Sequence, residues 1–126
     1  MKEITVLKVA PMCEPEVVAL KNDLRSLQEA VSIGADYTGL IEVVELDAQT
    51  CILCNEEGKL IGLEPNRRLG YDILCGVFYV VGQDRQGNFA SLSSASMEKY
   101  KQFFARPETI TPEETEATMI SACYVM

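Results

Sequence analysis

A β-rich stretch in the middle of this chain constrains its fold more than any other feature. Two apolar runs, at residues 50–54 and 73–82, are rich in β-branched and aromatic residues, which is typical of strands. The second run does not alternate with polar residues, so it predicts a strand buried on both faces, and Gly76 within it predicts a bulge or a close backbone approach. Gly58 predicts a hairpin turn, after which residues 59–61 return along the first run. Short connections of this kind favour an antiparallel sheet, because parallel strands need a long crossover between them.

Two further strands and two helices are predicted on either side of this stretch. Residues 4–9 and 40–46 are short apolar runs of the strand type. Over residues 15–31, a proline flanked by two glutamates is followed by apolar side chains three or four positions apart, which predicts an amphipathic helix. Ser93 is placed to cap a second helix over residues 94–105.

The predicted fold class is therefore α+β, with a mainly antiparallel sheet of about five strands and the two helices packed on it. We expect residues 1–106 to form this single domain. The remaining residues, 107–126, contain four glutamates and no basic residue, and residues 111–114 resemble a capping box. This last segment is predicted to be either an acidic tail or a short docked helix.

The charge and the missing residue types exclude several classes of function. The net charge is -8 and there is no histidine. An acidic chain does not attract phosphate backbones, so direct nucleic-acid binding is not expected. Without histidine, Ser-His and Cys-His catalysis and most catalytic zinc sites are excluded, and we expect neither a metal nor a cofactor. No apolar run has the length of a membrane span and the start lacks a signal-peptide pattern, so a cytoplasmic protein with reduced thiols is expected.

The spacing of Cys51 and Cys54 is a candidate metal or redox motif. Side chains three positions apart on a strand point to opposite faces, so these two thiols are not expected to share a metal or to pair. A zinc site also needs four ligands, and no second pair with this spacing exists. We therefore interpret both cysteines as core residues.

The best candidate site is a polar segment between the two runs, which is predicted to be a loop fixed at both ends by leucines. Its candidate ligand- or partner-binding residues are Asn66, Arg67, Arg68 and Asp72. Adjacent arginines offer planar forks of donors for a phosphate or a carboxylate. The opposing interpretation is structural, with one arginine paired to Asp72 or Glu64 and the other solvated. Both interpretations stay open at the level of the sequence.

A set of motifs gives the chain a family resemblance over residues 3–105. They are ITVLKVAP, IEVVEL, CNEEGKLIGLEPNRRL, the D-x-x-x-G of Asp72 to Gly76, and FYVVG. With these motifs the chain resembles the family catalogued as domain of unknown function 3846, small proteins of phages, plasmids and conjugative elements of gut Firmicutes and related bacteria. The resemblance implies no activity. It implies accessory cargo of mobile elements, sometimes beside or fused to anti-restriction modules, and the segments 32–36 and 107–126 depart from its pattern.

Three hypotheses about function follow. The leading one is a non-enzymatic accessory protein of a mobile element that binds a host component, in the manner of an anti-restriction protein. The alternative is a protein that binds or sequesters a phosphorylated nucleotide through Arg67 and Arg68. The third is an enzyme that uses Glu56 or Asp72, although no pair of a base and a nucleophile is visible, so an enzymatic activity is left open and no catalytic residue is assigned. The oligomeric state is open in all three.

Overall fold

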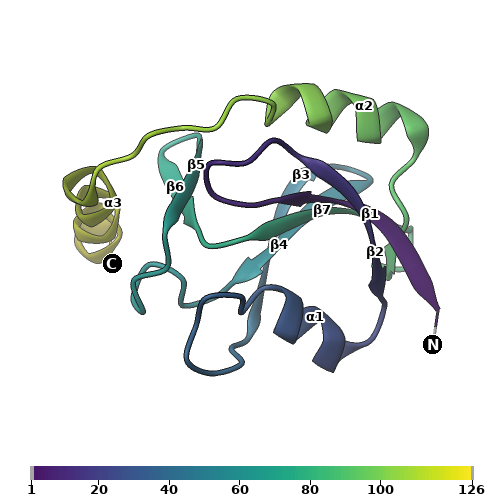
Figure 1. Ribbon diagram of the computed structural model, residues 1–126, viewed down its shortest axis with the longest axis horizontal. Helices are drawn as coiled ribbons and strands as arrows, with labels where there is room; N and C mark the ends of the chain where they lie inside the picture. The colour runs from purple at the N-terminus through teal and green to yellow at the C-terminus, as the bar shows by residue number, and fades with distance from the viewer. Residues whose placement is uncertain (1, 126) are drawn as a thin grey trace.

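The computed structural model describes residues 2–125, with side chains as far as Met119. It has eight strands and three helices over these residues (Figure 1). In chain order they are β1 (Glu3–Val9), β2 (Glu16–Lys21), α1 (Leu24–Ala30), β3 (Ile41–Asp47), β4 (Thr50–Asn55), β5 (Pro65–Leu69), β6 (Asp72–Cys75), β7 (Phe78–Gln83), β8 (Phe89–Ala90), α2 (Ser94–Phe103) and α3 (Pro112–Val125).

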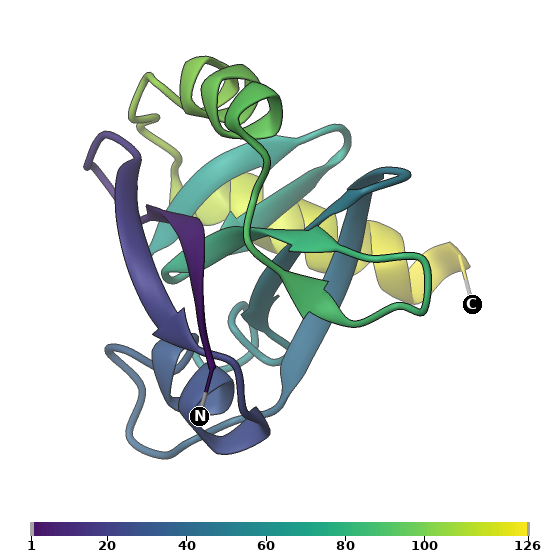
Figure 2. The ribbon, with the colours of Figure 1, turned by 90° about the vertical axis from the view of Figure 1, so that its right-hand side faces the viewer.

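The main sheet has the strand order β2-β1-β7-β4-β3, and the short β8 also pairs with β7. Every pairing in it is antiparallel, and β5 and β6 form a separate antiparallel hairpin. The predicted fold class, α+β with a mainly antiparallel sheet, is therefore confirmed. Strands β2 and β3 form the two edges of the sheet, as Figure 2 shows for β3.

The two faces of the main sheet carry two separate cores. Helix α2 covers one face and α1 the other (Figure 1). On the α2 side, Phe78 of β7 packs edge-on against Phe104, with ring centroids 5.1 Å apart. Cys54 belongs to the core on the α2 side and Cys51 to the core on the α1 side, so the prediction that these thiols lie on opposite faces is confirmed. The side chain of Cys123 lies outside the described part of the chain.

The helix predicted over residues 15–31 is wrong in its first half. Residues Glu16–Lys21 form β2, which pairs with β1 in continuous register, so that Val17 lies opposite Leu7. The apolar spacing fitted a helix, but β-branched residues also suit a strand, and pairing with β1 decided between them. The helix begins only at Leu24, where Asp23 caps it by accepting a hydrogen bond from the Ser26 N–H at 2.8 Å.

The predicted hairpin between residues 50–54 and 59–61 is also wrong. Strand β4 lies between β3 and β7, so both of its edges are already paired and no position is left for a returning strand. Residues 56–62 instead form turns, with the Leu63 N–H donating to the Gly58 carbonyl at 2.9 Å. This turn passes so close to β6 that a Cβ on Gly58 would lie 2.8 Å from the Cys75 carbonyl oxygen.

The apolar run predicted over residues 73–82 is interrupted at Gly76, which separates β6 from β7. Gly76 has φ of 83°, and a Cβ there would lie 2.7 Å from a methyl carbon of Leu63. The predicted close approach at this glycine is confirmed. After it, residues 78–82 of β7 are buried, as the absence of alternation predicts. The last segment, left open between a tail and a helix, forms α3, and the Thr111 hydroxyl accepts a hydrogen bond from the Glu114 N–H at 3.2 Å.

Candidate functional site

The predicted arginine loop is a strand, β5, and its first polar side chain lies inside the molecule. Asn66 is fully buried. Its Nδ2 donates to the Val9 carbonyl at 2.9 Å and to the Gly76 carbonyl at 2.8 Å. One amide therefore ties the end of β1 to the junction between β6 and β7.

Arg67 is 1% exposed, so its guanidinium lies inside the molecule and is not open to a ligand at the surface. Its Nη2 donates to the Cys13 carbonyl at 2.6 Å and to the Phe104 carbonyl at 3.1 Å. Its Nη1 donates to Asn66 Oδ1 at 2.8 Å. Burial lowers the pKa of this guanidinium, yet arginine remains protonated in proteins, so the positive charge is held by carbonyl dipoles. Arg67 joins the β1–β2 turn, β5 and the end of α2.

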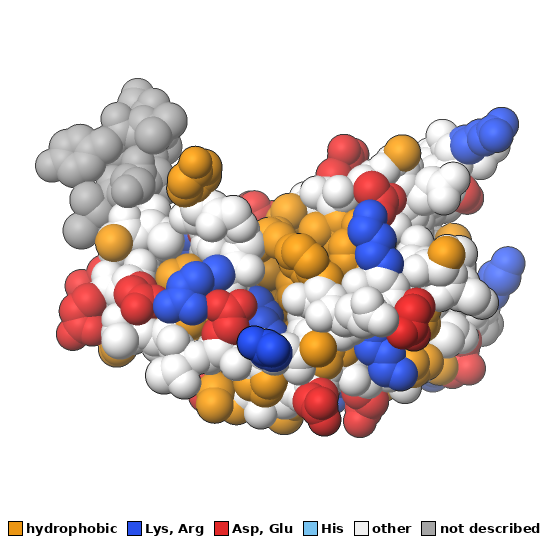
Figure 3. All heavy atoms as spheres, turned by 90° about the horizontal axis from the view of Figure 1, so that it is seen from above, with side chains coloured by type: hydrophobic (Ala, Val, Ile, Leu, Met, Phe, Trp, Pro, Cys, Tyr) orange, Lys and Arg blue, Asp and Glu red, His pale blue; other side chains and the backbone are white. Residues whose placement is uncertain are grey.

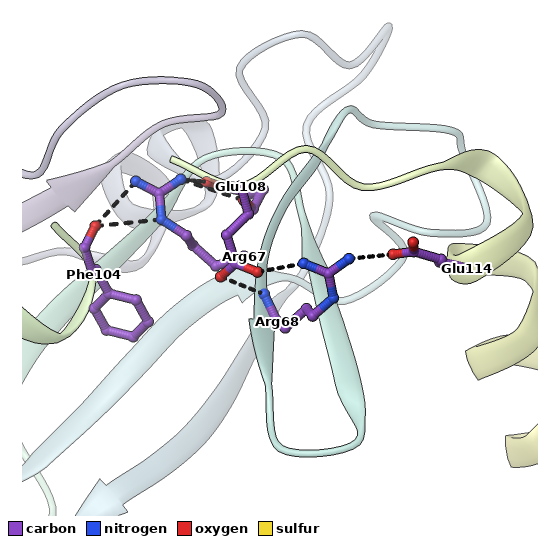
Figure 4. A network of polar contacts seen from close by, with 6 residues as sticks. Arg67, Arg68, Phe104, Glu108 and Glu114 are labelled. Carbon is purple, nitrogen blue, oxygen red and sulfur yellow. Dashed lines mark hydrogen bonds and ion pairs between the residues drawn. The ribbon is translucent and has the colours of Figure 1, made fainter. Parts of the chain in front are cut away.

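Arg68 points away from Arg67, toward the C-terminal segment (Figure 4). Its Nη1 bonds Glu108 Oε1 at 2.7 Å, its backbone N–H donates to Glu108 Oε2 at 3.2 Å, and its Nη2 pairs with Glu114. The hydrogen bonds that Arg68 donates to these two carboxylates raise its pKa. The side chain is 46% exposed, so both ion pairs are open to solvent.

Asp72 does not pair with either arginine. Its carboxylate pairs with Lys59 and accepts a hydrogen bond from the Ile73 N–H at 2.8 Å. The structural interpretation named Asp72 or Glu64 as the partner of an arginine, and this pairing is wrong, because Glu108 and Glu114 take that place. The four candidate residues therefore have three different roles. Asn66 and Arg67 form a buried polar cluster, which we call the β5 clamp. Arg68 binds the C-terminal segment, and Asp72 belongs to a separate ion pair with Lys59. Their role in binding stays a prediction.

A groove with a cavity of about 320 Å³ lies elsewhere, between β3, β4, β6 and α3, and we call it the β3–β6 groove. Residues that line it include Glu42, Cys54, Leu60, Asp72, Leu74 and Met119. Seen from the α2 side, hydrophobic side chains gather in a hollow of the surface (Figure 3). The sequence did not reveal this groove, because four elements that lie far apart in the chain contribute to it. Three of its acidic residues were visible in the sequence: Glu42, a charge within the apolar run of β3, and Glu56 and Asp72, which the enzyme hypothesis named.

The two thiols of the β3–β6 groove, Cys54 and Cys75, hold their protons firmly. Burial and the neighbouring Glu42 raise the pKa of the Cys54 thiol to about 12, and burial raises that of Cys75. Both thiols are therefore protonated and poorly nucleophilic at neutral pH. Glu42 and Glu56 have no ion-pair partner among the described side chains. Within the described residues, no group of three or more potential metal-ligating side chains is present.

A hydrogen bond between α2 and the end of β3 fixes the helix over the sheet. The Tyr100 hydroxyl donates to Asp47 Oδ2 at 2.6 Å, and Lys99 Nζ lies 3.9 Å from the same oxygen. The hydrogen bond from Tyr100 is the main cause that lowers the pKa of Asp47. Burial and then Asp47 raise the pKa of Tyr100 to about 12.

A family model described as Domain of unknown function (DUF3846) matches residues 4–105. The chain belongs to this family. No curated protein and no solved structure matched the chain. In this DUF3846 protein the matched region contains the main sheet, the β5–β6 hairpin and α2, whereas α3 lies beyond it. No helix over the described residues is long and apolar enough to cross a membrane.

Proposed function

We propose that this DUF3846 protein is a non-enzymatic accessory protein of a mobile genetic element, and that it acts by binding a host protein of a restriction-type defence system. The observation that supports this function best is the β3–β6 groove, which combines apolar walls with the carboxylates of Glu42 and Glu56, neither of which has an ion-pair partner among the described side chains. The resemblance to proteins of phages and plasmids supports the origin and the type of partner.

The chemistry of the groove suits a protein surface better than a reaction. Its thiols are protonated at neutral pH, which makes them weak nucleophiles. Its carboxylates Glu42 and Glu56 are exposed, so they can meet basic side chains, and the net charge of -8 attracts a basic partner over a longer range. DNA-binding host proteins present basic surfaces of this kind.

Plating of phage on a restricting host tests this proposal. Unmodified phage is plated on cells that carry a restriction system and express the protein, and on the same cells with a frameshifted gene. We expect the intact gene alone to raise the plating efficiency, because the protein occupies the restriction component. If plating is the same with both genes across several restriction systems, the proposed partner class is wrong.

A phosphorylated small molecule bound at Arg68 is a second candidate. The half-exposed side chain of Arg68 favours it, since a phosphate could reach this guanidinium by displacing Glu108 and Glu114. A thermal-shift screen with nucleoside mono-, di- and triphosphates tests it. Saturable binding would raise the melting temperature of the protein but not of the Arg68→Ala variant. An unchanged melting temperature with every nucleotide would reject this candidate.

A further inference from the structure

The outer edge of β3 carries backbone N–H and C=O groups that have no hydrogen-bond partner in the described part of the chain. The Glu56 N–H donates to the Leu40 carbonyl at 3.0 Å, so these two residues form a hydrogen-bonded pair that continues the β3–β4 ladder. Such pairs alternate along an antiparallel ladder, so Glu42 and Val44 also bond to β4. The Gln83 N–H donates to the Gln49 carbonyl at 2.9 Å. By the same alternation, Cys51 and Leu53 of β4 bond to β7, which leaves Ile52 and Cys54 to bond to β3.

The alternate residues of β3 therefore turn their backbone outward. They are Ile41, Val43 and Glu45, and their three N–H and three C=O groups face away from the sheet. These groups make no hydrogen bond to the described backbone or to the side chains described as far as Met119. A β-bulge between Glu45 and Asp47 ends this regular window.

The side chains along this window specify a chemistry for a partner strand. Glu42 and Val44 point to the α2 side, where Glu42 also lines the β3–β6 groove. Val43, 44% exposed, and Glu45 point to the opposite side. Neither glutamate has an ion-pair partner among the described residues. A neighbouring strand would therefore place basic residues beside Glu42 and Glu45 and apolar residues beside the two valines between them.

We propose that β3 is a docking edge, to which an extended partner segment with the pattern basic–apolar–apolar–basic adds as a further strand. This inference rests on the proposed binding function and names the structural form of the partner. Main-chain hydrogen bonds to Ile41, Val43 and Glu45 supply affinity, and the two charge pairs select the sequence.

The charge of the two edge strands explains why β3 is the docking edge and β2 is not. Strand β3 contains three acidic residues and no basic one, whereas β2 contains one of each, Glu16 and Lys21. A basic segment is therefore attracted more strongly to β3 than to β2. Strand β2 also offers a matched control, because its pairing with β1 directs the backbone of Val17 outward and leaves its side chain 47% exposed.

The test uses the acetylated and amidated peptide Val-Lys-Val-Val-Lys-Val as the probe and Val-Glu-Val-Val-Glu-Val as its acidic control. Binding is followed through the backbone amide resonances of the full chain. We expect the basic peptide to shift the amides of Ile41, Val43 and Glu45, and added salt to weaken the binding. No shift on β3, or equal shifts with the acidic peptide, would overturn the proposal.

Two proline variants locate the contact. Val43→Pro removes an outward N–H without removing a bond to β4, and it should weaken peptide binding about tenfold, whereas Val17→Pro should leave it unchanged. Should Val43→Pro fail to fold, the double variant Glu42→Lys with Glu45→Lys replaces it, with loss of basic-peptide binding expected. Retained binding in either folded β3 variant, or a dimer of the wild-type chain that dissociates on Val43→Pro, would contradict a partner-strand site.

The failure of this inference can be distinguished from failure of the proposed function. Phage protection that persists in folded Val43→Pro and in the folded double-lysine variant would leave the proposed function standing and reject the docking edge. If the peptide binds β3 in the resonance experiment but the protein protects phage from no restriction system, the proposed function is rejected and the docking edge stands.

Discussion

Arg67 shows how a residue with the chemistry of a ligand-binding group can instead serve the fold. It is the largest side chain among those that are almost fully buried, and its donors are used by carbonyl groups of Cys13 and Phe104 and by Asn66. The Cys13 carbonyl lies 54 residues from Arg67 in the chain and the Phe104 carbonyl lies 37 residues from it, so no local pattern in the sequence could reveal these contacts. The sequence shows the two adjacent arginines, but it does not show which of their side chains points into the core and which points to the surface.

Arg67→Ala should lower the free energy of unfolding by about 3 kcal/mol or more, because it leaves buried carbonyls unpaired and opens a cavity. Arg67→Lys should recover only part of this loss, since an ammonium group cannot reproduce the planar fork. Denaturant unfolding measures both values. A loss below about 1 kcal/mol for the alanine variant would show that the clamp contributes little to stability.

Tyr100 and Asp47 make stability depend on pH at both extremes. The folded pKa of Asp47 is lowered, so its contribution is present above the ordinary value of 3.8 and is lost as the pH falls through the lower folded value. The folded pKa of Tyr100 is raised to about 12, so its contribution is complete below 10.0 and is lost as the pH rises toward the folded value.

Tyr100→Phe removes this hydrogen bond and is the direct test. The difference in unfolding free energy between wild type and Tyr100→Phe should be constant at intermediate pH and should shrink below about pH 4 and above about pH 10. Denaturant titrations at a series of pH values measure it. A difference that is the same at all pH values would show that the bond does not couple to titration.

At the scale of elements, the sequence predicted what local signals decide. Ser93 was expected to cap a helix, and its hydroxyl accepts a hydrogen bond from the Ser96 N–H at 3.1 Å. The apolar run at residues 73–82 was expected to be one strand buried on both faces, and its part after Gly76 forms the buried central strand β7. These features depend on neighbours in the chain, which a reader of the sequence can see.

Elements that depend on distant partners could not be predicted in the same way. The segment of β2 has apolar residues at helical spacing, and only its pairing with β1 makes it a strand. The β3–β6 groove needs β3, β4, β6 and α3 to meet, so none of its parts indicates a site when taken alone. Tertiary pairing overrides propensity most easily where, as in β2, both patterns fit.

Two ion pairs tie α3 and the segment before it to the family domain. Arg68 pairs with Glu108, which precedes α3, and with Glu114 in its first turn, while Ile110 packs beside the small core around Leu63. Partly exposed ion pairs contribute little to global stability, but they can hold a single element in place.

Arg68→Ala should therefore reduce global stability by less than about 1 kcal/mol while it speeds hydrogen exchange of the α3 amides. High salt should have the same effect on the wild type, since salt screens exposed charges. Arg25→Ala, which removes the exposed Arg25–Glu29 pair of α1, is the matched control and should leave exchange in α3 unchanged. Unchanged α3 exchange in Arg68→Ala would mean that the ion pairs do not hold the helix.

At the scale of the whole molecule, the fold separates stability from binding. The buried side chains of Asn66 and Arg67 in β5 tie together β1, the β1–β2 turn, the β6–β7 junction and the end of α2, whereas the acidic strand β3 lies at an edge of the main sheet beside the β3–β6 groove. Changes to exposed charges on β3 should therefore alter binding while they leave the fold intact, since such substitutions usually change stability by less than about 0.5 kcal/mol.

The measurement that tests this account most directly is phage plating with two charge-reversal variants of equal stability. Glu42→Lys changes the groove and the docking edge, and Glu16→Lys makes the same exchange on the opposite edge strand. On a restricting host, we expect wild type and Glu16→Lys to raise the plating efficiency equally and Glu42→Lys to leave it at the level of cells without the gene. Full protection by a folded Glu42→Lys variant, or no protection by the wild type against any restriction system, would contradict the account.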